Sequence, residues 1–168
     1  MNMTHYMQLL ADNQPWNLLL FMAVPVVLAE SVTITELFIL LKRPVGGPLR
    51  SISRAAGALG GIYFVGVFAY LMATAVLPLT SSGQWRGPAD VIAVGFYLAG
   101  VLPLGLIALL DLGWLGGAWP QERRQAVHAA AVAVFLVVAH VAMIFGMMDP
   151  TLLGSTAPAP AHEMHMDH

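Results

Sequence analysis

Four long apolar segments dominate this chain of 168 residues. They run from about Trp16 to Leu41, Ile52 to Leu79, Ala89 to Trp114 and Ala126 to Met148. A helix that crosses a bilayer needs about 20 predominantly apolar residues, and each segment reaches that length. Charged residues make up only 10% of the chain, whereas a typical soluble domain carries about 25%. The sequence therefore predicts an all-α fold, an integral membrane four-helix bundle in a lipid bilayer.

Short breaks separate the four segments. "KRPVGGPLR" and "GGAWPQERR" are basic and rich in Gly and Pro, and "TSSGQWRGPAD" is polar, which is typical of turns. We therefore expect one four-span domain over residues 1–150, followed by a disordered, flexible tail over 151–168. The first fifteen residues lack a basic region and a long apolar core, so a cleaved signal peptide is not expected.

The positive charges are distributed unevenly over the loops. Six of the seven Lys and Arg residues flank the first and third loops, and Arg86 alone lies in the second. Basic residues near span ends stay in the cytoplasm, so these two loops are expected to be cytoplasmic. We therefore predict a multi-pass protein of the bacterial inner membrane with both termini in the periplasm.

Composition and motifs exclude several functions. The net charge of −2 gives no indication of nucleic-acid binding, and the absence of cysteine excludes thiolate chemistry. GxSxG, HExxH, Walker and GxGxxG motifs are all missing. We expect a protein that is not an enzyme.

Small residues and prolines interrupt the apolar segments. Gly57 and Gly61 form a GxxxG step, which predicts close packing between helices. Pro25 and Pro103 lie inside the first and third segments, where each removes a backbone donor and is expected to kink its helix.

The amino terminus carries a short amphipathic pattern. Met3, Tyr6, Met7 and Leu10 follow the spacing of one helix face. We expect a helix lying flat at the outer membrane surface, with His5 off the apolar stripe.

Ionisable residues lie at depths where a charge is unfavourable. Glu30 and Glu36 occur within the first segment, with Thr33 between them. His128 and Asp111 are placed near the depth of Glu36 by their distance from the span ends. Acids within a membrane mark ion or proton pathways by default, so these five residues form a candidate ion or proton path. The alternative is that the acids hold the bundle together through hydrogen bonds.

Potential metal ligands cluster at the opposite depth and in the tail. His140, Met143 and Met147 share one helix face, and Met22 and Met72 lie at a similar depth. Imidazole and thioether groups suit copper, so we expect a metal site there. His5 is a further candidate ligand. The tail adds five more: His162, Met164, His165, Met166 and His168. The leading hypothesis is a permease-like protein that binds and transports a soft transition-metal ion such as copper.

Two other function classes stay open. Small four-helix b-type cytochromes hold haem between histidines on facing helices. Here His128 and His140 lie on one helix, roughly 18 Å apart, so haem b would need another partner. The third hypothesis is a non-catalytic accessory subunit of a larger membrane complex. A complete transporter of this size would work as a homo-oligomer.

Two stretches, "MNMTHYMQLLADNQPWNLLLFMAVPV" and "LAESVTITELF", carry a resemblance. The chain resembles an uncharacterised family of small bacterial four-helix inner-membrane proteins labelled permeases. The resemblance covers nearly all of the chain except the tail. It implies an inner-membrane location, without an assigned substrate or site residue.

Overall fold

The computed structural model of this protein describes residues 3–42 and 47–150. In these ranges the chain forms helices and turns, with no strand. Four helices are long and apolar enough to cross a membrane: Trp16–Lys42, Pro48–Ser82, Pro88–Asp111 and Gln121–Met147. The all-α prediction is confirmed, and the protein is a multi-pass membrane protein.

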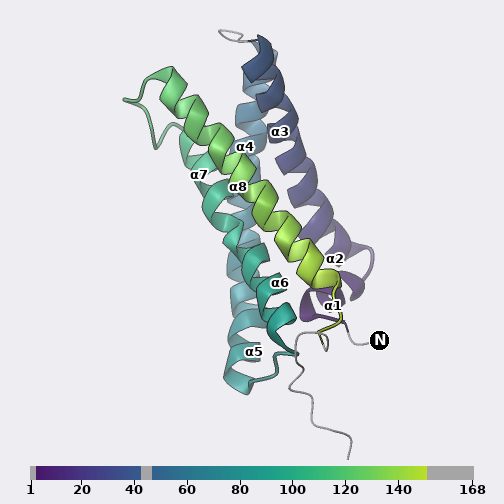
Figure 1. Cartoon of the computed structure of the whole chain (residues 1–168). Coiled ribbons are helices and arrows are strands. Elements are labelled where there is room, and N and C mark those ends of the chain that lie inside the picture. The colour runs from purple at the N-terminus through teal and green to yellow at the C-terminus, as the bar shows by residue number, and fades with distance from the viewer. Residues whose placement is uncertain (1–2, 43–46, 151–168) are drawn as a thin grey trace, which may run out of the picture.

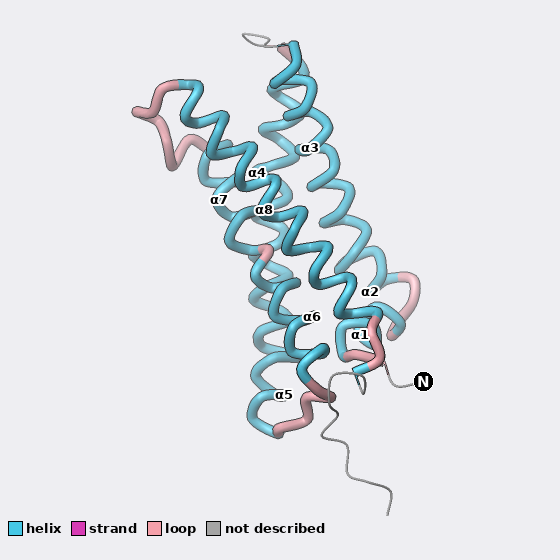
Figure 2. The backbone as a smooth tube through the Cα atoms, in the orientation of Figure 1, coloured by secondary structure: helices cyan, strands magenta, loops and turns pink. Residues whose placement is uncertain are grey.

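The first two spans are each built from three consecutive helical pieces. Figure 2 draws all of these pieces as helix, in cyan. The first comprises α2 (Trp16–Leu18), the π-helical segment η1 (Leu19–Ala23) and α3 (Val24–Lys42). The second comprises α4 (Pro48–Leu71), the π-helical segment η2 (Met72–Val76) and α5 (Leu77–Ser82). This span is longer than the predicted 52–79, because Pro48 begins the helix and Gly83, at a φ of 65°, ends it.

The third and fourth spans complete the bundle. The third comprises α6 (Pro88–Ala99) and α7 (Val101–Asp111), and the fourth is the single helix α8 (Gln121–Met147). The third span ends before the predicted Trp114, since Gly113 adopts a left-handed φ of 79°. A short helix at the amino terminus, α1 (His5–Ala11), precedes the first span.

Successive spans run in opposite directions (Figure 1). One end of the bundle, here called the arginine end, is where α3 finishes and α8 begins. It carries Lys42, Arg50, Arg54, Arg123 and Arg124. The other end, the terminal end, holds α1 and the last turn of α8 (Figure 1). The described chain therefore begins and finishes at the same end of the bundle.

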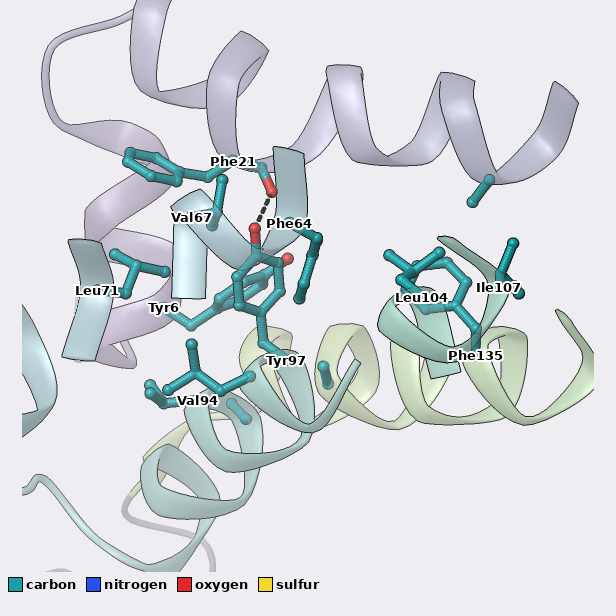
Figure 3. Packing of buried hydrophobic residues seen from close by; sticks show 14 of the residues in the cluster. Tyr6, Phe21, Phe64, Val67, Leu71, Val94, Tyr97, Leu104, Ile107 and Phe135 are labelled. Carbon is teal, nitrogen blue, oxygen red and sulfur yellow. Dashed lines mark hydrogen bonds between the residues drawn. The ribbon is translucent and has the colours of Figure 1, made fainter. Parts of the chain in front are cut away.

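Prolines account for the irregular segments of the spans. Pro25 has no N–H to donate to the carbonyl of Phe21, and the helix widens into η1 just before it. The freed carbonyl accepts a hydrogen bond from the hydroxyl of Tyr97 at 2.6 Å (Figure 3). Pro103 leaves the carbonyl of Ala99 free in the same way, and the third span is divided there into α6 and α7.

Glycines bring α4 and α7 into close contact, as the GxxxG step predicts. A Cβ atom placed on Gly61 would lie 2.4 Å from the Cβ of Ala108, closer than any real contact. A Cβ atom on Gly57 would lie 2.7 Å from Cγ2 of Ile107. Neither position tolerates a side chain without a shift of α7, so the prediction of close packing is confirmed.

The core at the terminal end is aromatic. The rings of Tyr6 and Phe64 each lie 5.3 Å from the ring of Tyr97 (Figure 3). Tyr6 belongs to α1, whose apolar residues Tyr6 and Leu10 are buried. The short amphipathic helix that the sequence predicts is present, and its apolar face packs against α6 and α8.

Candidate functional site

Three ionisable side chains from three helices meet near the arginine end. His128 of α8 lies between Glu36 of α3 and Asp111 of α7. Its Nδ1 is 2.9 Å from a Glu36 oxygen, and its Nε2 is 3.1 Å from an Asp111 oxygen. The contact with Glu36 has the distance of an ion pair without the alignment of a hydrogen bond, as the unpaired Nδ1 indicates. Sequence depth alone had placed these three residues at one level, and the structure brings them together.

This cluster, hereafter the Glu–His–Asp triad, depends on local packing. Gly57 of α4 leaves the space that the Asp111 carboxylate fills, because a Cβ at Gly57 would lie 2.1 Å from Asp111 Oδ2. Glu36 and His128 are only 8% and 5% exposed. One carboxylate oxygen of Glu36, Oε2, is buried without a hydrogen-bond partner. A buried carboxylate oxygen without a donor is costly, so Glu36 is either protonated or accepts from a group outside the described side chains.

The triad forms the floor of a cavity of about 730 Å³ at the arginine end. The walls come from α3, α4, α8 and the turn before α8. Polar residues nearer the rim include Arg50, Ser51, Ser53, Arg54, Gln121, Arg124 and Gln125. A polar cavity of this size is unusual in a chain of such high hydropathy, which marks it as a candidate binding site.

A second pocket, of about 450 Å³, lies toward the terminal end between the first span and α8. Its walls are mainly apolar. The sequence-predicted metal face lines it, namely His140, Met143 and Met147. Met22 of η1 and Met7 of α1 line the same pocket. The structure thus brings one imidazole and four thioethers together around one space. They come from two parts of the chain that are more than a hundred residues apart. This space is hereafter called the methionine pocket.

The tautomer of His140 follows from its hydrogen bond. Nδ1 lies 2.6 Å from the carbonyl oxygen of Leu136, one turn earlier in α8. A carbonyl can only accept, so Nδ1 carries the proton and, in the neutral ring, Nε2 holds the lone pair. A carbonyl that fixes the second ring nitrogen is the usual arrangement of a metal-binding histidine.

The remaining candidates of the predicted ion path lie apart from the triad. Glu30 lines the methionine pocket and is exposed on the bundle surface. The hydroxyl of Thr33 donates to the carbonyl of Ala29 within its own helix at 2.8 Å. Thr33 is therefore engaged locally. Glu30 and Glu36 belong to separate cavities.

His5 is engaged by a buried acid that sequence reasoning missed. Asp90, which is fully buried at the start of α6, accepts from the His5 backbone N–H at 2.6 Å. Its other oxygen lies 2.5 Å from His5 Nδ1 and 3.3 Å from the Arg86 backbone nitrogen. The Arg86 side chain donates to the Met3 carbonyl and to Gln8. The available signal was an Asp in the first turn of a helix, two residues after Pro88.

The described residues contain no group of three His, Asp or Glu side chains arranged to hold one metal ion. Within the triad, the two acids approach opposite nitrogens of His128 and do not converge on one point. Both of these nitrogens therefore face carboxylates, which leaves His128 unsuited to ligate haem iron. The predicted tail ligands, His162 to His168, lie outside the described residues.

A comparison with known protein families gives a match that covers all four spans and both cavities. The match is to a family of unknown function, DUF6803, and covers residues 1–162. The chain belongs to the DUF6803 family. The matched region includes every residue of both cavities and ends at the first histidine of the tail. Searches among curated proteins and among solved structures found no match.

The DUF6803 match agrees with the expected resemblance to an uncharacterised family. It provides no substrate, no reaction and no membrane assignment. The chemistry of the two cavities is therefore the basis for assigning a function.

Proposed function

We propose that this protein is a permease-like membrane protein that binds and transports a soft transition-metal ion, with copper as the ion that fits. The observation that carries the proposal is the methionine pocket, where His140, Met143, Met147 and Met22 share one space. Thioethers and imidazole favour Cu(I) over harder ions. The lone pair of His140 on Nε2 supplies a nitrogen ligand.

The position of Met22 strengthens this assignment. It lies in η1, where Pro25 disrupts the regular helix. Single π-helical turns occur frequently at functional sites, because they alter the direction of side chains within an otherwise regular helix. A ligand on such a segment could follow a change in helix geometry during transport.

Buried apolar residues separate the methionine pocket from the triad. Val32 lies between Glu30 and Glu36 on α3, and Val132 lies between His128 and His140 on α8; both valines are buried. Transport would therefore need a rearrangement that opens one cavity as the other closes. In this scheme the triad and Glu30 exchange protons or balance the charge of the ion.

The direction of transport depends on the orientation in the membrane. The positive charges at the arginine end support a cytoplasmic location for that end by the positive-inside rule. The methionine pocket and the tail would then face the periplasm. A periplasm-active reporter fused after His168 should be active, whereas activity of a cytoplasmic reporter alone would reverse this orientation.

Uptake into liposomes tests the proposal directly. Purified protein is reconstituted with a Cu(I)-sensitive dye inside, and uptake is compared for the wild type, Met143→Leu/Met147→Leu and His140→Gln. Leu replaces Met with little change in volume, so the fold should persist while the thioethers are lost. Met72→Leu is the matched control, because Met72 lies in η2 and does not line the pocket.

We expect uptake to fall at least about tenfold in both pocket variants and to stay unchanged in the control, since each loses direct ion ligands. Equal uptake in all four proteins would refute a metal site in this pocket. A chain that ends at Ala161 should bind less copper in total yet retain the pocket site. A Soret band in the purified protein would instead favour the cytochrome alternative.

A further inference from the structure

The cavity at the arginine end combines opposite charges in one space. Its floor is the Glu–His–Asp triad, and its outer walls carry Arg50, Arg54 and Arg124. At about 730 Å³ it has room for far more than a bare ion. The metal-transport proposal uses the triad only to exchange protons or balance charge, and it does not account for the arginines that line the same cavity.

The floor carries a net charge of −1 in either of two proton arrangements. If both carboxylates are ionised, the two contacts of His128 require an imidazolium ring. If Glu36 is protonated instead, the ring is neutral and Asp111 keeps its charge. In the first arrangement, Glu36 Oε2 remains a buried acceptor without a donor. A protonated amine in the cavity matches this charge, and it can donate the missing hydrogen bond once the Glu36 side chain turns its buried Oε2 toward the cavity.

The arginines on the cavity walls favour a negatively charged group on the ligand. Arg54 lies three residues before Gly57, the residue against which the Asp111 carboxylate packs. Its Cα therefore lies roughly 5 Å along the helix axis from the Cα of Gly57, toward the arginine end. Arg124 is anchored by donation to the Leu110 carbonyl, which occupies only part of its five-donor guanidinium. Guanidinium groups recognise phosphate and carboxylate geometry.

A ligand with a single type of charge does not fit this cavity. The arginines disfavour a bare cation as a stable occupant of the whole cavity, and the acids disfavour a bare anion. The cavity also opens at the end of the bundle, where arginines lie at the level of lipid headgroups. We infer that the arginine-end cavity binds a phosphate ester of a small amino alcohol, with phosphate on Arg54 and Arg124 and ammonium on Glu36. Ethanolamine phosphate is the simplest compound of this class, either free or as the headgroup of phosphatidylethanolamine.

Binding measurements on the full chain test this inference. Delipidated protein in detergent is titrated with phosphatidylethanolamine, phosphatidylcholine or phosphatidylglycerol, and bound lipid is counted by native mass spectrometry. The trimethylammonium of phosphatidylcholine has no N–H to donate to Glu36, and phosphatidylglycerol has no cation. Free ethanolamine phosphate is titrated in parallel by calorimetry, which separates a soluble ligand from a lipid.

Two variants and one control assign the contacts. Arg54→Gln alters an exposed wall residue and leaves the triad intact. Glu36→Gln keeps the shape of the floor and removes its charge. Arg123→Gln is the matched control, because Arg123 lies at the same end against Trp119 and does not line the cavity.

We expect one tightly bound phosphatidylethanolamine or ethanolamine phosphate, held at least about fivefold more tightly than the choline lipid. Affinity should fall about tenfold in Arg54→Gln and in Glu36→Gln, and stay unchanged in Arg123→Gln, as loss of one charge-assisted hydrogen bond implies. If Glu36→Gln does not fold, the lipid preference of the wild type and the affinity of Arg54→Gln still decide whether the inference holds. Equal binding of all three lipids, or tighter binding of phosphatidylglycerol, would overturn the inference. Failure of copper uptake would leave it unaffected, since the two sites share no residue.

Discussion

The hydroxyl of Tyr97 donates to the carbonyl of Phe21 at 2.6 Å and so fills the gap that Pro25 leaves in the first span. Both partners are buried. Tyr97→Phe should therefore leave an unsatisfied carbonyl in the core and lower the free energy of unfolding by about 1–3 kcal/mol. Chemical denaturation in detergent micelles measures this loss. Tyr70→Phe is the control, because Tyr70 stacks on Phe21 with an exposed side chain.

A second substitution tests the cause of this hydrogen bond. Pro25→Ala restores a backbone N–H that can donate to the Phe21 carbonyl. The loss caused by Tyr97→Phe should then be smaller in a Pro25→Ala background than in the wild type. An equal loss in both backgrounds would show that Pro25 and Tyr97 are not coupled.

Gly57 is expected to control the position of Asp111 in the triad. In Gly57→Ala the new methyl group would overlap the Asp111 carboxylate and Ile107, so these side chains must be displaced from their positions against α4. We expect a loss of about 1–3 kcal/mol in the free energy of unfolding, as in other overpacked cores. Gly66→Ala in the same helix meets nothing within 4 Å and should be neutral or slightly stabilising. Similar losses for the two substitutions would contradict close packing at Gly57.

Asp90 is expected to hold α1 on the bundle. Asp90→Asn removes the charge that faces His5 Nδ1 and replaces an acceptor oxygen with a donor. Leaving the hydrogen-bonding groups of His5 without this buried acceptor costs about 1–3 kcal/mol, so α1 should be held less tightly on the bundle. Faster hydrogen exchange over His5–Ala11 would report this release. Asp12→Asn, at the exposed end of the same helix, should leave exchange unchanged, and unaltered exchange in Asp90→Asn would refute the role of Asp90.

The docking of α1 should also weaken at alkaline pH through Tyr6. Burial raises the pKa of Tyr6 from 10.0 to about 12, which favours the neutral phenol in the folded protein. Its contribution to stability is thus complete below about pH 10 and lost as the pH rises toward 12. The difference in the free energy of unfolding between wild type and Tyr6→Phe, measured from pH 8 to 12, should shrink above pH 10. A constant difference would contradict this prediction.

The sequence by itself determined the four spans, since about twenty consecutive apolar residues have few alternatives to a membrane-crossing helix. It also determined the close packing at Gly57 and Gly61, because small residues at that spacing allow helices to approach. Depth along each helix follows from a fixed rise per residue, and this was enough to place Glu36, Asp111 and His128 at one level.

Only the tertiary structure decided which side chains face one another around the helix axes. Depth does not fix rotation, so the pairing of His128 with two acids and the gathering of Met22 with His140 required the packed bundle. The same holds for α1, whose apolar stripe suits a membrane surface and a protein surface equally well. The partners of this helix are Asp90, buried at the start of α6, and Gly146, whose carbonyl accepts from Thr4. Such contacts join residues 85 and 142 positions apart, and local sequence patterns carry no information over that distance.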